Sequence, residues 1–182
     1  MERASEELLV LSAQTGNSKA FNILFKCYNS SLLRFALKIC NDSTLAAEAV
    51  QEAWINCARN LKKLQDPRAF RSWMYQLVRW RAIDQIRKIR LKQIPFDEAG
   101  TDQNDFNSQK STIDNEDLKS LINQLPAIDQ QAIYLFYYEE MKISEIAVVL
   151  KIPSGTVKSR LNRARNTLKN KLELNQEFKN EH

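Results

Sequence analysis

A segment near the C-terminus combines basic and hydrogen-bonding residues in a pattern suited to DNA recognition. From Lys151 to Leu172 the chain carries seven basic residues and no acidic one. Wound as a helix, this segment places apolar side chains on one face and polar or cationic side chains on the other. With its N-terminal end in the major groove, such a helix presents hydrogen-bonding groups to base edges and cations to phosphates. The residues predicted to contact DNA are Ser154, Thr156, Lys158, Ser159, Arg160, Asn162, Arg163 and Arg165.

The residues just before this segment complete the pattern of a helix-turn-helix. In KISEIAVVLKIPSGTVKSRL, Ser144 is expected to cap a short helix, residues 151–153 form the turn, and Ser154 is expected to cap the second helix. A basic helix exposed to solvent is the plainer alternative, and the charge run alone does not exclude it. The short helix, the turn and an inward apolar series together favour DNA binding. That inward series comprises Ile146, Val149, Leu150, Val157, Leu161, Ala164 and Leu168.

A second basic segment, Arg68–Lys92, has aromatic residues interleaved among eight basic residues and one acidic residue, Asp84. A helical face with tryptophans beside arginines suits unstacked bases, because bases stack on aromatic rings while cations hold the phosphates. The alternative is that Trp73 and Trp80 are core residues and that the arginines form a solvated rim. The predicted face comprises Trp73, Gln76, Trp80, Ile83 and Arg87, at helical steps of three and four.

A third candidate surface lies in AAEAVQEAWI, where Glu48, Gln51, Glu52 and Ile55 have helical spacing. On a helix these four residues, called here the acidic stripe, form a polar band beside an apolar edge. Plain solvent-exposed surface explains the band, and so does a docking face for a partner helix. The spacing alone leaves both interpretations open.

The chemistry that the sequence lacks excludes most enzymes. The only histidine is His182, so histidine-based acid–base catalysis and histidine-ligated zinc are not expected. Cys27, Cys40 and Cys57 form no C-x-x-C pair and lie in apolar helical patterns, which predicts buried thiols in a reducing cytosol. The sequence has no Walker-type loop and no scaffolded cluster of carboxylates. We therefore predict no enzymatic activity, no metal, no cofactor and no small-molecule substrate.

The sequence also predicts a cytoplasmic protein without membrane insertion. No apolar run approaches the roughly 18–20 residues needed to span a bilayer. The first residues, MERASEE, are acidic where a signal peptide is basic.

The elements that must position these surfaces are expected to be helices throughout. The 182 residues include only 3 glycines and 4 prolines, too few for the turns of a β-sandwich or barrel. Between these residues the apolar positions recur at steps of three and four. In Asp129–Glu140, the apolar side is expected to consist of Ile133, Phe136 and Tyr137. The other expected helices are Phe21–Ile39, Thr44–Leu61, Arg68–Lys92, Leu118–Leu125, Ser144–Leu150 and Ser154–Leu174.

Charge divides the chain into three parts. Residues 1–95 carry 16 basic and 8 acidic groups, residues 96–117 carry 1 and 7, and residues 118–182 carry 10 and 7. Two basic modules indicate a polyanionic partner, and nucleic acid is the first candidate. The acidic part has no periodic apolar face, which predicts a flexible linker. The fold prediction is all-α, with small helical domains at 1–94 and 118–175, a flexible acidic linker at 95–117 and a tail at 176–182.

These motifs together resemble the extracytoplasmic-function (ECF) class of bacterial sigma factors. AAEAVQEAWI is similar to that family's helix for binding core RNA polymerase. FRSWMYQLVRWRAIDQIRK is similar to its helix for promoter melting and −10 recognition, and LPAIDQQ…ARNTLK to its −35-recognition module. The most specific part is EIA…GTVKSRLNRAR. The matches are collinear and cover most of the chain outside the linker and tails.

The resemblance implies a transcription initiation factor whose partners are core RNA polymerase, promoter DNA and an anti-sigma factor. It implies that the acidic stripe contacts the polymerase and that Lys158, Ser159, Asn162 and Arg163 recognise a −35-type element. It also implies that the loop Leu61–Pro67 holds a flipped base and that the linker threads towards the RNA exit path. The implied −10-type and melting residues are Leu61, Lys62, Lys63, Arg71, Trp73, Gln76, Arg79, Trp80, Ile83, Asp84 and Arg87.

Three residues depart from the family's usual pattern. Ala49 stands where the family usually has an acid, and Trp80 where it usually has asparagine. Lys151 stands where the family usually has glycine, and a left-handed backbone there costs a residue with a Cβ roughly 1–2 kcal/mol. These departures bear on polymerase contact, on strand handling and on the helix-turn-helix turn, respectively.

The sequence therefore predicts a sigma factor that anchors upstream duplex DNA with one module and captures unpaired bases with the other. One rival is a polymerase-independent helix-turn-helix regulator, which predicts a ligand cavity in residues 1–92 and a dimer on a palindrome. A nucleic-acid enzyme is a second rival, but it lacks the metal-binding carboxylates or phosphate loop that phosphoryl transfer requires.

Overall fold

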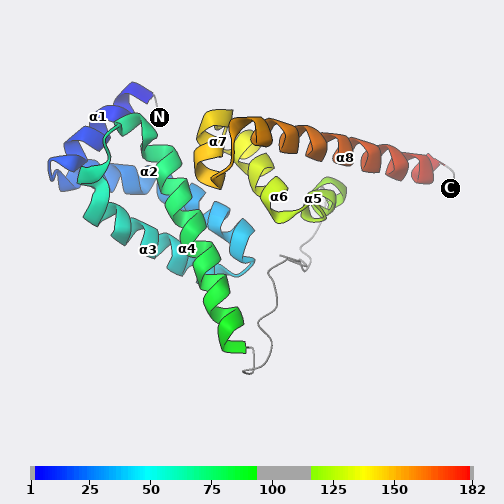
Figure 1. Ribbon diagram of the computed structural model, residues 1–182, viewed down its shortest axis with the longest axis horizontal. Helices are drawn as coiled ribbons and strands as arrows, with labels where there is room; N and C mark the ends of the chain where they lie inside the picture. Colours follow the sequence, from blue (N-terminus) through cyan, green and yellow to red (C-terminus); the bar gives the residue numbers. More distant parts are fainter. Residues whose placement is uncertain (1–2, 94–115, 181–182) are drawn as a thin grey trace. The chain divides into compact units, whose positions relative to one another are not determined.

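The computed structural model describes residues 3–93 and 116–180, and the regular secondary structure in these ranges is entirely helical (Figure 1). The chain divides into two compact units, Met1–Glu98 and Ala99–His182. The all-α prediction is therefore confirmed for the described residues. The predicted linker, 95–117, lies outside them apart from its last two residues, which begin a helix, and the last two residues of the predicted tail also lie outside.

The first unit is a bundle of four helices joined by short turns. Asn17 caps the second helix by accepting hydrogen bonds from the N–H groups of Lys19 and Ala20, at 3.0 and 3.2 Å. Asp42 caps the third by accepting from the Leu45 N–H at 2.9 Å. These side chains satisfy helix N–H groups that have no partner within the helix. The elements are α1 (Arg3–Gln14), α2 (Ser18–Cys40), α3 (Ser43–Asn60), η1 (Leu61–Lys63), η2 (Pro67–Ala69) and α4 (Phe70–Gln93).

The core of this unit forms where α2 packs against α1, α3 and α4. Phe35 of α2 and Tyr75 of α4 are fully buried, with ring centroids 5.3 Å apart. Burying a large apolar side chain contributes about 1.5–3 kcal/mol, so the apolar periodicity of α2 fixes its orientation. Phe25, at the edge of that periodic series, is exposed and rests against the Trp54 ring at 5.1 Å.

In the second unit, a helix that begins at Ala127 continues from Tyr134 to Tyr138 with the wider turn of a π-helix. The Glu139 N–H donates to the Tyr134 carbonyl at 3.2 Å, which is the spacing of a π-helix. Tyr137 is consequently 52% exposed, and the prediction that it belongs to the apolar side is wrong. The prediction assumed 3.6 residues per turn, whereas the wider turn rotates the side chains that follow it. The elements are α5 (Glu116–Asn123), α6 (Ala127–Ile133), η3 (Tyr134–Tyr138), α7 (Ile143–Leu150) and α8 (Ser154–Asn180).

Both predicted serine caps of the helix-turn-helix are wrong by a small shift in chain position. The carbonyls of Lys142 and Pro153 accept the first helical hydrogen bonds of α7 and α8, so these two residues occupy the capping positions. Ser144 and Ser154 lie inside the helices instead. At α7 the backbone N–H of Lys142 donates to the Glu145 carboxylate at 2.7 Å.

The turn between α7 and α8 has a left-handed residue at its start. Lys151 has φ 55° and ψ 45°, which lies in the left-handed region. The N–H of Ile152 donates to the Ala147 carbonyl at 3.2 Å, and that of Lys151 to the Val148 carbonyl at 3.4 Å. These two bonds form a Schellman motif, which satisfies carbonyls at the end of α7. The Lys151 side chain is exposed, so packing does not restrict which residue can stand here. The restriction comes from the positive φ of the backbone.

We expect Lys151→Gly to raise the free energy of unfolding by about 1 kcal/mol, because glycine adopts the left-handed conformation without steric cost. Urea denaturation of the purified chain measures the change. Lys158→Gly, in the exposed interior of α8, serves as the control and is expected to lower stability by about 1 kcal/mol. A Lys151→Gly variant that is less stable than the parent would contradict the assignment of strain to this turn.

The three cysteines differ in environment. Cys40 and Cys57 are buried as predicted, but Cys27 is exposed and the prediction is wrong for it. Cys27 lies one position before the buried Tyr28, on the outer side of α2, so its place in an apolar stretch did not determine its burial. Burial raises the pKa of the Cys40 thiol to about 11 and that of Cys57 to about 12.

These environments predict one rapidly reacting thiol in the native chain. The thiolate is the reactive form, and a raised pKa leaves little thiolate on Cys40 and Cys57 at pH 8. Titration with a disulfide reagent at pH 8 should therefore release about one equivalent at once, and three only after denaturation. Peptide mapping should place the early label on Cys27. Equal early labelling of all three thiols would show that the first unit is not packed as described.

Candidate nucleic-acid and polymerase interfaces

The rotation of α8 is fixed by apolar side chains on its inner face. Val157, Leu161 and Ala164 are buried, and α8 packs there against α6 and α7. Leu168, the last member of the predicted series, is half-buried. The opposite face is exposed, as predicted. Its exposed residues include Lys158, Ser159, Asn162, Arg163, Arg165 and Asn166, whereas Thr156 and Arg160 are half-buried at its edge.

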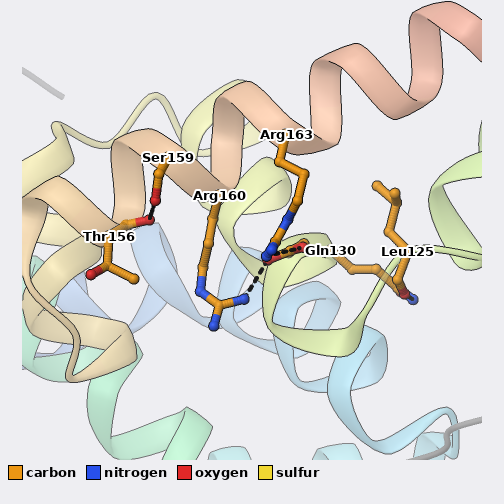
Figure 2. Close-up of polar contacts among 7 residues, drawn as sticks. Leu125, Gln130, Thr156, Ser159, Arg160 and Arg163 are labelled. Carbon is orange, nitrogen blue, oxygen red and sulfur yellow. Dashed lines mark hydrogen bonds and ion pairs between the residues drawn. The ribbon is translucent and has the colours of Figure 1, made fainter.

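Two arginines on this helix share one buried carboxylate, a contact that no sequence pattern indicated. Arg160 Nη1 donates to Asp129 Oδ1 at 2.8 Å, and Arg163 Nη2 donates to Asp129 Oδ2 at 3.2 Å. Figure 2 shows both arginines extending from α8 towards α6. The Asp129 side chain is only 2% exposed, against 26% for Arg160 and 63% for Arg163. The only signal in the sequence was an acid in the first turn of a helix that is otherwise apolar or neutral.

Other polar contacts hold the neighbouring segments in place. Gln130 Nε2 donates to the carbonyls of Asn123 and Leu125, at 3.0 and 2.7 Å, and so satisfies acceptors where α5 ends. Figure 2 shows Gln130 and Leu125. The Ser159 hydroxyl donates to the Thr156 carbonyl at 3.0 Å. Its oxygen lone pairs are therefore the groups it offers to a ligand.

The predicted base-stacking face of α4 is accessible. Trp80 is 51% exposed, which excludes the alternative that it is a core residue. Ile83 and Arg87 are also exposed, whereas Trp73 and Gln76 are half-buried. On the opposite side of α4 lie the fully buried side chains of Phe70, Met74, Tyr75, Val78 and Ala82.

A hydrogen-bonded group links this face to the acidic stripe on α3. The Arg81 guanidinium carbon lies 4.5 Å from the centroid of the Trp80 ring, a cation–π arrangement. Arg81 Nη1 also lies 3.2 Å from Glu52 Oε2, and Gln85 Nε2 donates to Glu52 Oε1 at 3.0 Å. Glu52 is therefore bonded within the unit, whereas Glu48, Gln51 and Ile55, the rest of the stripe, are exposed.

The loop before α4 is tied to α1. Gln14 Nε2 donates to the carbonyls of Leu61 and Leu64, at 2.9 and 2.7 Å. Leu61 is buried, so its side chain belongs to the core, while Lys62 and Lys63 are exposed. At the far end of the loop, hydrogen bonds from Arg68 lower the pKa of the Asp66 carboxyl. The loop thus exposes Lys62 and Lys63 on a backbone that Gln14 holds by two hydrogen bonds.

The remaining predicted residues of α4 are less exposed. Arg79 is half-buried, and burial lowers the pKa of its guanidinium. Arg71 is half-buried as well. Asp84 forms an ion pair with Lys88 at 2.9 Å, one helical turn further along α4.

Among the described residues, no group of three or more histidines, cysteines and carboxylates is placed to hold a metal ion.

The two halves of the chain match two models of one protein family. Residues 24–91 match Sigma-70 region 2, and residues 115–168 match Sigma-70, region 4. The chain is 27% identical over 176 residues to the ECF RNA polymerase sigma factor SigW of Bacillus subtilis strain 168, covering 90% of this chain and 94% of the relative. It is 27% identical over 185 residues to the ECF RNA polymerase sigma-E factor of Escherichia coli strain K12, covering 94% and 96%. This chain belongs to the ECF sigma factors.

A solved structure supports the fold of this sigma factor. The structure of CnrH in complex with the cytosolic domain of CnrY matches with a TM-score of 0.68 and 22% identity, covering 93% of this chain and 98% of that one. Family membership also decides between the functions considered from the sequence. Sigma factors are non-enzymatic initiation factors, so the expectation that the chain is not an enzyme is confirmed, and a polymerase-independent regulator is not favoured. None of the described helices is both apolar and long enough to cross a bilayer.

The three departures from the family pattern lie in different environments. Ala49 is fully buried, so its lack of charge leaves the exposed residues of the stripe unchanged. Lys151 adopts the left-handed conformation that glycine would adopt freely. Trp80 adds a large exposed ring beside Arg81.

We expect Trp80→Ala to slow promoter opening about tenfold or more, because stacking of a base on an aromatic ring contributes about 1–3 kcal/mol. Closed-complex formation should change little, and so should stability, because the side chain is half exposed. Permanganate reactivity of unpaired thymines measures opening with time. Leu91→Ala, which removes another exposed apolar side chain from α4, is the matched control and should leave opening unchanged. Equal effects of the two variants would contradict a stacking role.

Proposed function

We propose a division of labour between the two units of this sigma factor. As an ECF sigma factor, the chain binds core RNA polymerase and directs promoter recognition and opening. The second unit would hold duplex DNA at the −35-type element, and the first would bind polymerase and the strands of the −10-type element. The single observation that supports this proposal best is the helix-turn-helix whose second helix, α8, exposes a polar and cationic face.

For the −35-type element, we assign direct base contacts to the exposed residues Lys158, Ser159, Asn162 and Arg163. Arginine and asparagine form bidentate hydrogen bonds with guanine and adenine in the major groove, and each such pair discriminates against the wrong base by about 1–3 kcal/mol. Phosphate contacts are assigned to residues at the edge and ends of the same face. These are Ser154, Thr156, Arg160 and Arg165.

For the −10-type element, we assign base stacking to Trp80 and backbone neutralisation to Lys62, Lys63 and Arg87. Opening a few base pairs costs several kcal/mol, since each stacking step is worth about 1.4 kcal/mol. Base capture and stacking on an exposed ring offset this cost. Leu61, being buried, would shape the loop rather than touch the base. The other assigned residues of this surface are Arg71, Trp73, Gln76, Arg79, Ile83 and Asp84.

For the polymerase, we assign docking to the acidic stripe on α3. Glu48 and Gln51 offer exposed polar groups beside the exposed apolar Ile55, which together suit a partner helix with basic and apolar residues. Glu52 already accepts hydrogen bonds from Arg81 and Gln85, so its contribution would be shared between the partner and α4.

We further propose that the chain acts in the cytoplasm and that an anti-sigma protein holds it inactive. Support for the second point comes from likeness to CnrH, whose structure was solved with the cytosolic domain of CnrY, and to RpoE of Bartonella quintana, solved with the anti-sigma factor NepR. RpoE matches with a TM-score of 0.66 and 22% identity, covering 85% of this chain and 98% of that one. No small-molecule substrate or cofactor is assigned.

Runoff transcription with purified bacterial core polymerase tests the proposed function. Core polymerase with this protein should start transcripts at defined positions on genomic fragments, whereas core alone or the protein alone should give none. The chain alone should also bind duplex promoter weakly. Tight binding of duplex by the chain without polymerase, together with no specific transcripts, would instead support a polymerase-independent regulator.

We expect Glu48→Lys to weaken binding to core polymerase by at least about tenfold, because it reverses an exposed charge at the N-terminal end of the stripe. Glu48 is a cleaner target than Glu52, whose replacement would also remove the acceptor for Arg81. Glu140→Lys makes the same charge change at an exposed site in the second unit and serves as the control. Fluorescence anisotropy with labelled core measures binding. If Glu48→Lys binds like Glu140→Lys, the docking face lies elsewhere.

A further inference from the structure

We propose that Asp129 is a positioning residue for base recognition at the −35-type element, acting through Arg163. The inference rests on the proposed function, because it concerns how α8 recognises DNA. It goes further by assigning specificity to a side chain on α6 that is too deeply buried to meet DNA itself. The evidence is the geometry of the Asp129, Arg160 and Arg163 group (Figure 2).

The two arginines have different relations to the carboxylate. Arg160 is mostly buried and makes the shorter contact, 2.8 Å, so it balances the charge of Asp129 inside the unit. Its Nε is buried and has no hydrogen-bond partner within the described part of the chain, so this side of the guanidinium faces the interior of the unit. Arg163 is 63% exposed and donates through one terminal nitrogen at 3.2 Å.

Because Arg163 uses one terminal nitrogen to bind Asp129, its other N–H donors are available to contact DNA. A guanidinium carries five N–H donors in a planar fork, and one bond to Asp129 holds the plane while leaving the other donors accessible. An arginine on an exposed helix face otherwise loses up to about 2 kcal/mol of rotamer entropy when it is fixed by a ligand. A carboxylate that fixes Arg163 beforehand reduces that loss and limits the directions in which the fork meets a base edge.

A masking role is the competing explanation for the same contact. In that case Asp129 would only occupy Arg163 and weaken its attraction to phosphates. Masking predicts that removing the carboxylate strengthens binding to every DNA sequence equally. Positioning predicts that removing it makes recognition less selective at the base that Arg163 contacts. The two explanations therefore differ in base preference.

The test uses the full chain with core polymerase and a promoter library in which the upstream element is randomised. The wild type first defines the preferred element, and each position is then substituted and scored by runoff transcription. Asp129→Asn should reduce discrimination at one position from about tenfold or more to about threefold or less. Arg163→Gln should affect the same position, and the double variant should do no more than Arg163→Gln. Glu140→Gln, which removes an exposed charge in the same unit, should leave all preferences unchanged.

Several outcomes would overturn the proposal. Unchanged discrimination in Asp129→Asn, a uniform gain or loss across all sequences, or an additional effect in the double variant would each contradict action through Arg163. If the wild type itself directs no transcription, the proposed function fails. If the wild type is selective and Asp129→Asn is equally selective, only the present inference fails.

A second measurement does not depend on the folding of Asp129→Asn. Nitrogen-15 NMR of the wild-type chain reports rotation about the guanidinium bonds of individual arginines. Arg160 and Arg163 should both rotate slowly, and Arg165, an exposed arginine on the same helix, should rotate freely. Free rotation of Arg163 at the rate of Arg165 would show that Asp129 does not hold it.

Discussion

The burial of one apolar series on α8 determines which residues of the helix-turn-helix face outward. Val157, Leu161 and Ala164 lie at steps of four and three, and their burial against α6 and α7 fixes the rotation of the helix. A rotation of one residue position would carry polar groups into the core, where an unsatisfied group costs free energy. The exposed face is therefore a consequence of packing, and the function of the second unit depends on it.

The first unit follows the same logic on α4. Its inner face is filled by fully buried side chains, including Phe70 and Tyr75, so the Trp80 side must face solvent. The polar group of Glu52, Arg81 and Gln85 then joins the acidic stripe to the proposed base-stacking surface. Glu52 thus belongs to the acidic stripe on α3 and at the same time holds two side chains of α4.

Sequence reasoning predicted the helices, the two modules and the exposed faces, because these depend on apolar periodicity and on the placement of glycine and proline. It failed where the local geometry was not a regular helix or where the contact was long-range. The exposure of Tyr137 depends on a π turn. The predicted serine caps are wrong because α7 and α8 begin earlier, with the carbonyls of Lys142 and Pro153 accepting the first helical hydrogen bonds. The Asp129 contacts join residues 31 and 34 positions apart, and no local pattern encodes such a pairing.

The left-handed turn at Lys151 shows that an exposed position can still restrict which residues it accepts. Its side chain meets solvent, so position 151 resembles one that accepts any residue. Its positive φ, however, disfavours valine, isoleucine and threonine, whose branched Cβ crowds the backbone in that conformation. Asn41 and Glu140 share this conformation in the described chain. Tolerance to mutation at these positions is set by backbone handedness, and a substitution chosen by surface accessibility alone would misjudge them.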